Sequence, residues 1–212
     1  PGAVFLASSA GGTYAGAPGS PYDEHTAPHP LSAYGSLKVA QEGILAAADI
    51  DAPVVIGRIA NLYGPGQDLR KSQGLITRLA ISATTREPLN LYVSLDTLRD
   101  FVYVDDAART ILDWMRVSEL RDVSGTQLKV IASGSAVSLG HILRLTQRLA
   151  RQRIPVSLGT DQAAWAQSFD LRLRPSHHPA VRRADMTPLP VGIARVLEHV
   201  RVQRNRGHRT GS

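Results

Sequence analysis

The sequence predicts an α/β fold with a mostly parallel sheet, and two observations support this prediction. Short apolar runs such as AVFLASS (3–9) and PVVIGRIA (53–60) alternate with longer stretches of helical periodicity. These runs break into loops rich in small and turn-forming residues, which is typical of strands buried in a parallel sheet. Ligands bind such sheets beyond the C-terminal ends of the strands. The segments SSAGG (8–12) and NLYGPG (61–66) lie at these ends, so we expect the functional residues there.

The other elements follow from periodicity and from capping residues. Ser32 can cap a helix over Tyr34–Ala48, which carries leucine, isoleucine and alanine on one face. Asp105 and Asp106 can cap a later helix. The expected strands are 3–9, 53–60, 89–93, 101–104 and 128–132, and the expected helices are 34–48, 74–85, 107–117, 138–151 and 191–202. Residues 10–31, 61–67 and 154–189 are predicted to be loops or irregular segments because they are rich in glycine, proline or both.

Composition narrows the class of protein. The chain has 212 residues, 43% hydrophobic content and a formal net charge of +6, which suit a globular protein with a sizeable core. It contains no cysteine, which excludes a disulfide scaffold, a thiolate metal site and a cysteine nucleophile. A reducing cytoplasm fits this composition. No apolar run approaches the ~20 residues that span a bilayer, so we expect no contact with a membrane.

Two further classes of partner are disfavoured. The basic stretch RVQRNRGHRTGS (201–212) could contact nucleic acid, but we favour a solvated terminus and expect no nucleic-acid partner. Two histidine pairs, His25/His29 and His177/His178, could suggest a metal ion. Prolines adjoin both pairs and no carboxylate lies at ligand spacing, so we expect no metal site.

The main chemical candidate is the pair Tyr34 and Lys38 within YGSLK. The four-residue spacing places both side chains on one face of the expected helix. A nearby ammonium stabilises a phenolate, which makes proton exchange between tyrosine and a substrate hydroxyl feasible. The spacing by itself favours the other interpretation, a tyrosine packed at a helix start beside a solvated lysine. The neighbouring segments therefore decide between the two interpretations.

Four motifs follow one another along residues 5–108: a Ser-Ser strand end, Tyr-Gly-x-x-Lys, Arg-x-x-Asn-x-Tyr-Gly-Pro and Arg-Asp-Phe-x-x-Val-x-Asp. Together they resemble the extended short-chain dehydrogenase/reductase family, in its NAD-dependent epimerase/dehydratase branch of the UDP-glucose 4-epimerase type. The resemblance implies the C-terminal part of a Rossmann-like parallel sheet plus a smaller mixed α/β substrate lobe. Residues 1–62 and 105–134 would form the partial NAD-binding domain, and residues 63–104 and 135–212 the lobe.

The resemblance implies roles for the residues that match the catalytic motifs. Tyr34 matches the catalytic acid/base, and Lys38 matches the lysine that holds the nicotinamide ribose. Ser9 matches the hydroxyl that orients the reacting sugar. Because the loop after Ser9 is one residue longer than usual, Ser8 is an alternative partner and a candidate cofactor contact.

The substrate-binding residues follow from the other two motifs. Asn61 and Arg99 match residues that hold the phosphates of a nucleotide sugar, and Arg182 or Arg183 matches a second phosphate-binding arginine. Without the family context, Asn61 is as readily a turn residue, and Arg99 a surface partner of a neighbouring aspartate.

The resemblance also favours one reaction. Dehydratases of the family carry Asp-Glu after the catalytic hydroxyl, whereas residues 10–14 here contain no acid. We therefore expect NAD-dependent epimerisation of a nucleotide sugar through a transient keto intermediate, with NADP not excluded. The alternatives are an NAD(P)-dependent reductase or dehydrogenase and a non-catalytic truncated homologue. The family's Gly-x-x-Gly-x-x-Gly motif is missing, so the chain is expected to be a fragment that binds NAD poorly as an isolated monomer. Family members pair through the tyrosine helix, which implies a homodimer.

Overall fold

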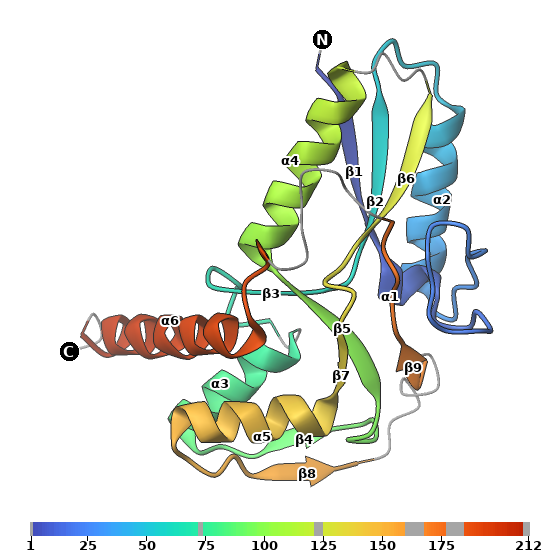
Figure 1. Cartoon of the computed structure of the whole chain (residues 1–212). Helices are drawn as coiled ribbons and strands as arrows, with labels where there is room; N and C mark the ends of the chain where they lie inside the picture. Colours follow the sequence, from blue (N-terminus) through green and yellow to red (C-terminus); the bar gives the residue numbers. More distant parts are fainter. Residues whose placement is uncertain (1, 72–73, 121–124, 160–167, 177–184, 210–212) are drawn as a thin grey trace.

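The computed structural model describes residues 2–71, 74–120, 125–159, 168–176 and 185–209. Strands and helices alternate along the chain, which confirms the predicted α/β class (Figure 1). The helices are α1 (Ala10–Thr13), α2 (Ala33–Ala47), α3 (Leu75–Thr85), α4 (Val104–Leu120), α5 (Leu139–Ala150) and α6 (Leu189–Arg209). The strands are β1 (Val4–Ser9), β2 (Val54–Ile59), β3 (Asn61–Tyr63), β4 (Leu89–Leu91), β5 (Leu98–Tyr103), β6 (Thr126–Ile131), β7 (Ala136–Ser138), β8 (Val156–Leu158) and β9 (Asp170–Leu171).

The first sheet has the order β1-β2-β6 and is parallel throughout. Its central strand β2 is buried from Val54 to Arg58, because α2 and α4 lie on opposite sides of the sheet (Figure 1). At the outer edge of the sheet, the Val130 N–H of β6 donates to the Glu24 carboxylate at 2.9 Å. Trp114 of α4 packs nearby, with the Lys129 ammonium 3.9 Å from the centre of its ring.

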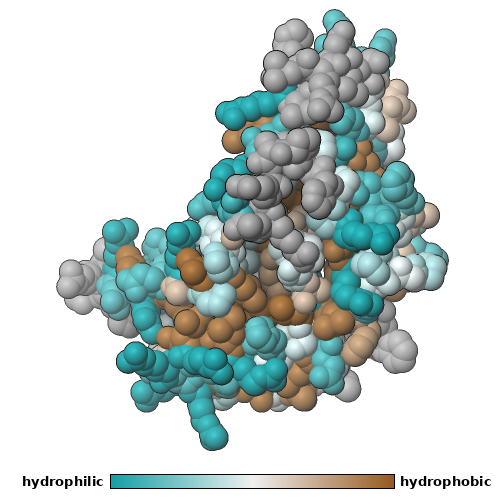
Figure 2. All heavy atoms as spheres, in the orientation of Figure 1, coloured by the Kyte–Doolittle hydropathy of each residue, from teal (hydrophilic) through white to brown (hydrophobic). Residues whose placement is uncertain are grey.

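A second group of elements surrounds β5, which pairs in parallel with β3 and β9 and antiparallel with β7. The helices α3, α5 and α6 pack against one another and enclose a separate apolar cluster that includes Leu79, Ile142 and Val196. Figure 2 shows apolar side chains in the lower half of the molecule, where α5 and α6 lie, bordered by hydrophilic residues. A two-stranded parallel pair, β4 and β8, completes this part.

Several elements differ from the sequence-based prediction. The helix α1 and the strands β3, β7, β8 and β9 lie where loops, irregular segments or no element were expected. Three of these strands pair with β5, so they depend on a distant partner rather than on their own apolar pattern. The apolar face of α2 exists but is open to solvent, since Leu37 and Ile44 are 56% and 73% exposed.

Of the predicted helix caps, Ser32 is confirmed, whereas the prediction for Asp105 and Asp106 is wrong. Ser32 accepts a hydrogen bond from the Gly35 N–H at 3.1 Å and begins α2. Asp105 and Asp106 lie inside the first turn of α4 rather than at a cap. Asp106 instead accepts the Thr187 N–H at 2.7 Å and so ties α4 to the segment before α6. Within the described residues, no helix has the length and hydrophobicity to cross a membrane.

Candidate active site

The predicted pair Tyr34 and Lys38 lies in the first turns of α2. The Lys38 Nζ atom is 5.9 Å from the centre of the Tyr34 ring, so the two side chains are neighbours. Lys38 donates one hydrogen bond, at 3.0 Å, to the Ala7 carbonyl near the C-terminal end of β1. The Tyr34 side chain is 55% exposed, which leaves its hydroxyl accessible to a ligand.

Tyr34 also lines a cavity of about 820 Å³ together with Asn61 and Arg99. Three of the residues predicted from separate motifs are therefore brought to one place. The wall of this cavity includes two residues that the sequence did not single out, Arg78 of α3 and the half-exposed Tyr92. Lys38, Ser8 and Ser9 are not among the residues that line it.

Arg99 is a buried cation at the cavity wall. Its guanidinium donates to the carbonyl of its neighbour Leu98 at 2.8 Å. Neither Asp96 nor Asp100, both in the described part of the chain, forms the surface ion pair that was the alternative interpretation. Burial lowers the pKa of Arg99 to about 10, and the charge of Asp170 opposes this shift. The guanidinium thus stays charged at neutral pH.

Asn61 begins β3 rather than a turn, and its side chain is fixed by a neighbouring strand. Its Nδ2 atom donates to the Asp100 carbonyl of β5 at 2.8 Å. The Asp100 carboxylate is fully buried and accepts the N–H and the hydroxyl of Ser133 at 2.8 and 2.9 Å. Burial raises the pKa of Asp100, although the Ser133 hydrogen bonds act in the other direction. Asp100 therefore joins β5 to the turn after β6.

The two serines at the end of β1 have different surroundings. The Ser9 hydroxyl accepts the Gly12 N–H at 3.2 Å and caps α1. The buried Ser8 hydroxyl donates to the Glu42 carboxylate. Beside Tyr34 lies Gly12, where a Cβ atom would be 3.2 Å from the tyrosine ring. Neither serine lines the cavity, so their expected contacts with sugar or cofactor stay predictions. Arg182 and Arg183 lie outside the described residues, as do His177 and His178.

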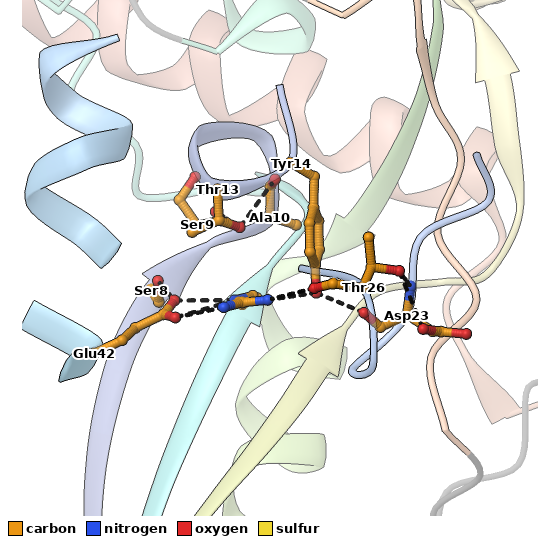
Figure 3. Close-up of polar contacts among 9 residues, drawn as sticks. Ser8, Ser9, Ala10, Thr13, Tyr14, Asp23, Thr26 and Glu42 are labelled. Atoms are coloured by element: carbon orange, nitrogen blue, oxygen red, sulfur yellow. Dashed lines mark hydrogen bonds and ion pairs between the residues drawn. The ribbon is translucent and has the colours of Figure 1, made fainter. Parts of the chain in front are cut away.

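A buried ion pair that was not predicted from the sequence joins β2 to α2, the helix that carries Tyr34 and Lys38. The Arg58 guanidinium of β2 contacts the Glu42 carboxylate of α2, with Nη2 and Oε2 2.7 Å apart. Figure 3 shows Glu42 and Tyr14 within the same run of polar contacts, which continues from Tyr14 to Asp23. A signal for it was available, because a charged residue within the apolar run VVIGRI requires a partner when the strand is buried.

Comparison with known proteins agrees with these motifs. The model of the NAD dependent epimerase/dehydratase family matches residues 2–123. A dTDP-L-rhamnose 4-epimerase from Burkholderia thailandensis is 34% identical over 125 residues, which are 58% of this chain and 33% of that protein. A dTDP-4-dehydro-6-deoxyglucose reductase from Escherichia coli is 27% identical over 141 residues, or 66% of this chain and 43% of that protein. The chain thus spans less than half the length of either curated relative.

The fold also has solved counterparts. The structure of MoeE5 in complex with UDP-glucuronic acid and NAD superposes with a TM-score of 0.78 at 28% identity. The match covers 95% of this chain and 66% of MoeE5. The Rossmann-like architecture implied by the motifs is therefore confirmed. The family model, which matches more than half of the residues, leads to the same assignment. This chain belongs to the NAD-dependent epimerase/dehydratase family.

Proposed function

We propose that this chain carries the proton-transfer and substrate-binding residues of an NAD-dependent nucleotide-sugar epimerase. The observation that carries the proposal is the shared cavity of Tyr34, Asn61 and Arg99, with Lys38 one helical turn from Tyr34. Two similar proteins support the substrate class. One is a dTDP-L-rhamnose 4-epimerase, and MoeE5 was solved with UDP-glucuronic acid and NAD.

The residues around Tyr34 fit the ribose of a nicotinamide cofactor. Lys38 uses one of its three N–H donors on the Ala7 carbonyl, which leaves two for ribose hydroxyls. The exposed Tyr34 ring offers a further hydroxyl on the same face of α2. NAD, when bound, supplies the hydride acceptor that an epimerase needs and returns the hydride afterwards.

Each side chain then has a defined task. Tyr34 takes the proton from the reacting sugar hydroxyl. It returns the proton after the keto sugar has rotated in the site and presents its opposite face. The Lys38 ammonium stabilises the phenolate that this transfer creates. Arg99, a buried cation without a carboxylate partner among the described residues, is suited to the substrate diphosphate. Asn61 is held by its bond to β5 at the same wall, which suits a second contact with the phosphates.

A reductase is the second candidate, because the Escherichia coli relative is a dTDP-4-dehydro-6-deoxyglucose reductase. The two reactions differ in their use of cofactor. An epimerase regenerates NAD in every cycle, whereas a reductase consumes reduced cofactor in proportion to product. A non-catalytic homologue would bind the nucleotide sugar without either reaction.

We also propose the division into an NAD-binding part (1–62 and 105–134) and a substrate lobe (63–104 and 135–212). Two separate apolar clusters support it, one around the first sheet and the other among α3, α5 and α6. A homodimer through α2 is proposed as well. The exposed Leu37 and Ile44 on this helix support it, because apolar side chains of this size favour burial at an interface.

The test compares the wild-type chain with Tyr34→Phe on UDP- and dTDP-sugars with added NAD. Calorimetric titration with NAD and then with each nucleotide sugar comes first, followed by NMR of the sugar to detect epimerisation. In an assembly that binds both ligands, we expect the wild type to turn over sugar without net cofactor reduction. Tyr34→Phe should bind sugar nucleotide normally, unfold at the same temperature and lose all turnover. Unchanged turnover in Tyr34→Phe would contradict the mechanism, and net cofactor consumption would favour the reductase.

A further inference from the structure

The Arg58 guanidinium, near the C-terminal end of β2, joins several segments of the chain, among them those of Glu42 and Tyr14, which Figure 3 labels. Its Nε and Nη2 atoms donate to the Glu42 carboxylate of α2 at 3.1 and 2.7 Å. Its Nη1 atom donates at 2.9 Å to the hydroxyl of Tyr14, which in turn donates to the Asp23 carbonyl at 2.7 Å. The Ser8 hydroxyl of β1 donates to the same Glu42 carboxylate. Strands, helix and the loop after α1 therefore meet at one cation.

The ion pair between Arg58 and Glu42 is shielded from water. Arg58 and Glu42 are 4% and 8% exposed, so each ion depends on the other for compensation. Burial lowers the pKa of Arg58, but the hydrogen bonds with Glu42 and Tyr14 outweigh burial and raise that pKa above its ordinary value. The fork of the guanidinium binds both oxygens of the carboxylate, a geometry that resists rotation of either group.

The helix α2 depends on these polar contacts to an unusual degree. The structure describes every residue of α2, and the fully buried ones are Gly35 and Glu42. A Cβ atom on Gly35 would lie 2.2 Å from the Gly12 carbonyl oxygen, so the helix touches the backbone of α1 at this point. No large apolar side chain of α2 is fully buried in the sheet. The glycine contact and the Glu42 ion pair are therefore the two buried attachment points.

The attachment points lie next to the reactive pair, because Gly35 directly follows Tyr34 and Glu42 lies one turn after Lys38. Tyr34, Lys38 and Glu42 follow one another at four-residue spacing, so they share one face of α2. Lys38 reaches the Ala7 carbonyl one turn before Glu42 meets Arg58. Any rotation of α2 about its axis would move Tyr34 within the cavity and separate Lys38 from β1.

We propose that Glu42 and Arg58 are positioning residues for Tyr34 and Lys38, an inference that rests on the proposed function of that pair. Neither residue lines the cavity, so both act through α2. The ion pair sets the rotation of the helix over β1, and with it the position of the tyrosine hydroxyl. Tyr14 extends the same restraint to the loop that precedes α2. A misplacement of about 1 Å lowers the rate of a positioned reaction by roughly a hundredfold.

The first measurement needs no activity. Hydrogen exchange of backbone amides is compared among the wild type, Glu42→Gln and the charge-matched control Asp113→Asn on α4. Asp113 forms a longer ion pair with Arg116, 3.9 Å apart at the surface, whose loss should have little effect. We expect faster exchange in α2 of Glu42→Gln, with α5 unchanged because it packs in the other apolar cluster. The control should match the wild type in both helices.

The second measurement separates positioning from a general loss of stability. For folded Glu42→Gln, we expect kcat to fall roughly tenfold to a hundredfold, and NAD to bind more weakly because Lys38 has moved. The KM for nucleotide sugar should change little, since Asn61 and Arg99 lie on other elements. Arg58→Lys keeps the charge but loses the fork, so its kcat should lie between those of the wild type and Glu42→Gln.

The outcomes are distinct. Unchanged exchange in α2, or equal acceleration in α2 and α5, would overturn the positioning role. A rise in KM with unaltered kcat would also overturn it, because that pattern belongs to lost substrate contacts. If the wild type shows no turnover at all, the proposed function fails, and exchange in α2 still decides whether Glu42 and Arg58 hold the helix.

Discussion

Replacing Arg99 with methionine should change stability and ligand binding in opposite directions. Arg99 is 9% exposed and, among the residues described, has a backbone carbonyl rather than a carboxylate as its hydrogen-bond acceptor. Burial lowers its pKa from the ordinary value of arginine to about 10, against the weaker effect of Asp170. The folded protein therefore holds this proton less tightly than the unfolded chain does. The positive charge of Arg99 is therefore buried at a cost in stability, and an anionic ligand would compensate this cost.

The magnitude follows from linkage. Because the folded-state pKa is the lower one, the charge costs stability throughout the range below about pH 10. The cost disappears as the pH rises above about 10, where first the folded and then the unfolded chain loses the proton. At about 1.4 kcal/mol per pKa unit, the lowering of the Arg99 pKa sets an upper limit of ~3.5 kcal/mol, and solvent relaxation reduces it to about 1–3 kcal/mol at pH 7. Methionine replaces the charge with an apolar chain of similar length.

Two assays on the same variant test this reasoning. Thermal unfolding at pH 7 should show Arg99→Met melting about 2–12 °C higher than the wild type. Calorimetry with UDP should show binding weaker by about tenfold to a hundredfold, the loss of a charge-assisted hydrogen bond. Arg99→Lys serves as the matched control, because it keeps a buried cation and should gain no stability. A lower melting temperature for Arg99→Met, or unaltered UDP affinity, would refute the account.

Other substitutions test the attachment of α2. Arg58→Met leaves Glu42 buried without a partner and should cost about 3–5 kcal/mol of unfolding free energy, whereas the double variant Glu42→Leu/Arg58→Met should cost less. Urea unfolding of these variants and the wild type measures the coupling energy between Glu42 and Arg58. Strictly additive losses of unfolding free energy would argue against a coupled pair. Gly35→Ala should lower the melting temperature, because its Cβ would lie 2.2 Å from the Gly12 carbonyl oxygen. Gly43→Ala on the same helix meets no atom within 4 Å and should raise it, by about 0.5–1 kcal/mol of stability; equal effects would mean that the close contact is unimportant.

Much of the first sheet could be predicted from the sequence. The run VVIGRI is apolar enough to specify the buried strand β2, and Ser32 with the periodicity after it specifies α2. The strand β3 could not be predicted in this way. Asn61-Leu62-Tyr63 has no strand pattern of its own, and it becomes a strand because it pairs in register with Phe101-Val102-Tyr103 of β5. Pairing between distant segments leaves little trace in local sequence.

The same limit applies to the candidate site. Motifs drew attention to Tyr34, Asn61 and Arg99, which then proved to share a cavity. The sequence could not show which side of the strand the Ser8 and Ser9 side chains face. Neighbouring residues of a strand face opposite sides, and one inserted residue exchanges the two sides. Nor could the partner of Arg58 be identified, since Glu42 lies 16 residues earlier on a different element.

The carboxylate of Glu24 has a consequence for strand addition to the first sheet. A free β-edge is a template on which another segment can add, and exposed backbone donors are what the incoming strand requires. On β6 the outward Val130 donor is already taken by Glu24, which also accepts the N–H and hydroxyl of Ser176. In the part of the chain that the structure describes, β1 pairs with β2 alone. Strand addition to this sheet is therefore hindered at Val130 beside β6 but not in this way beside β1, where an added strand would lie next to the segment that leads into Ser9 and the tyrosine helix.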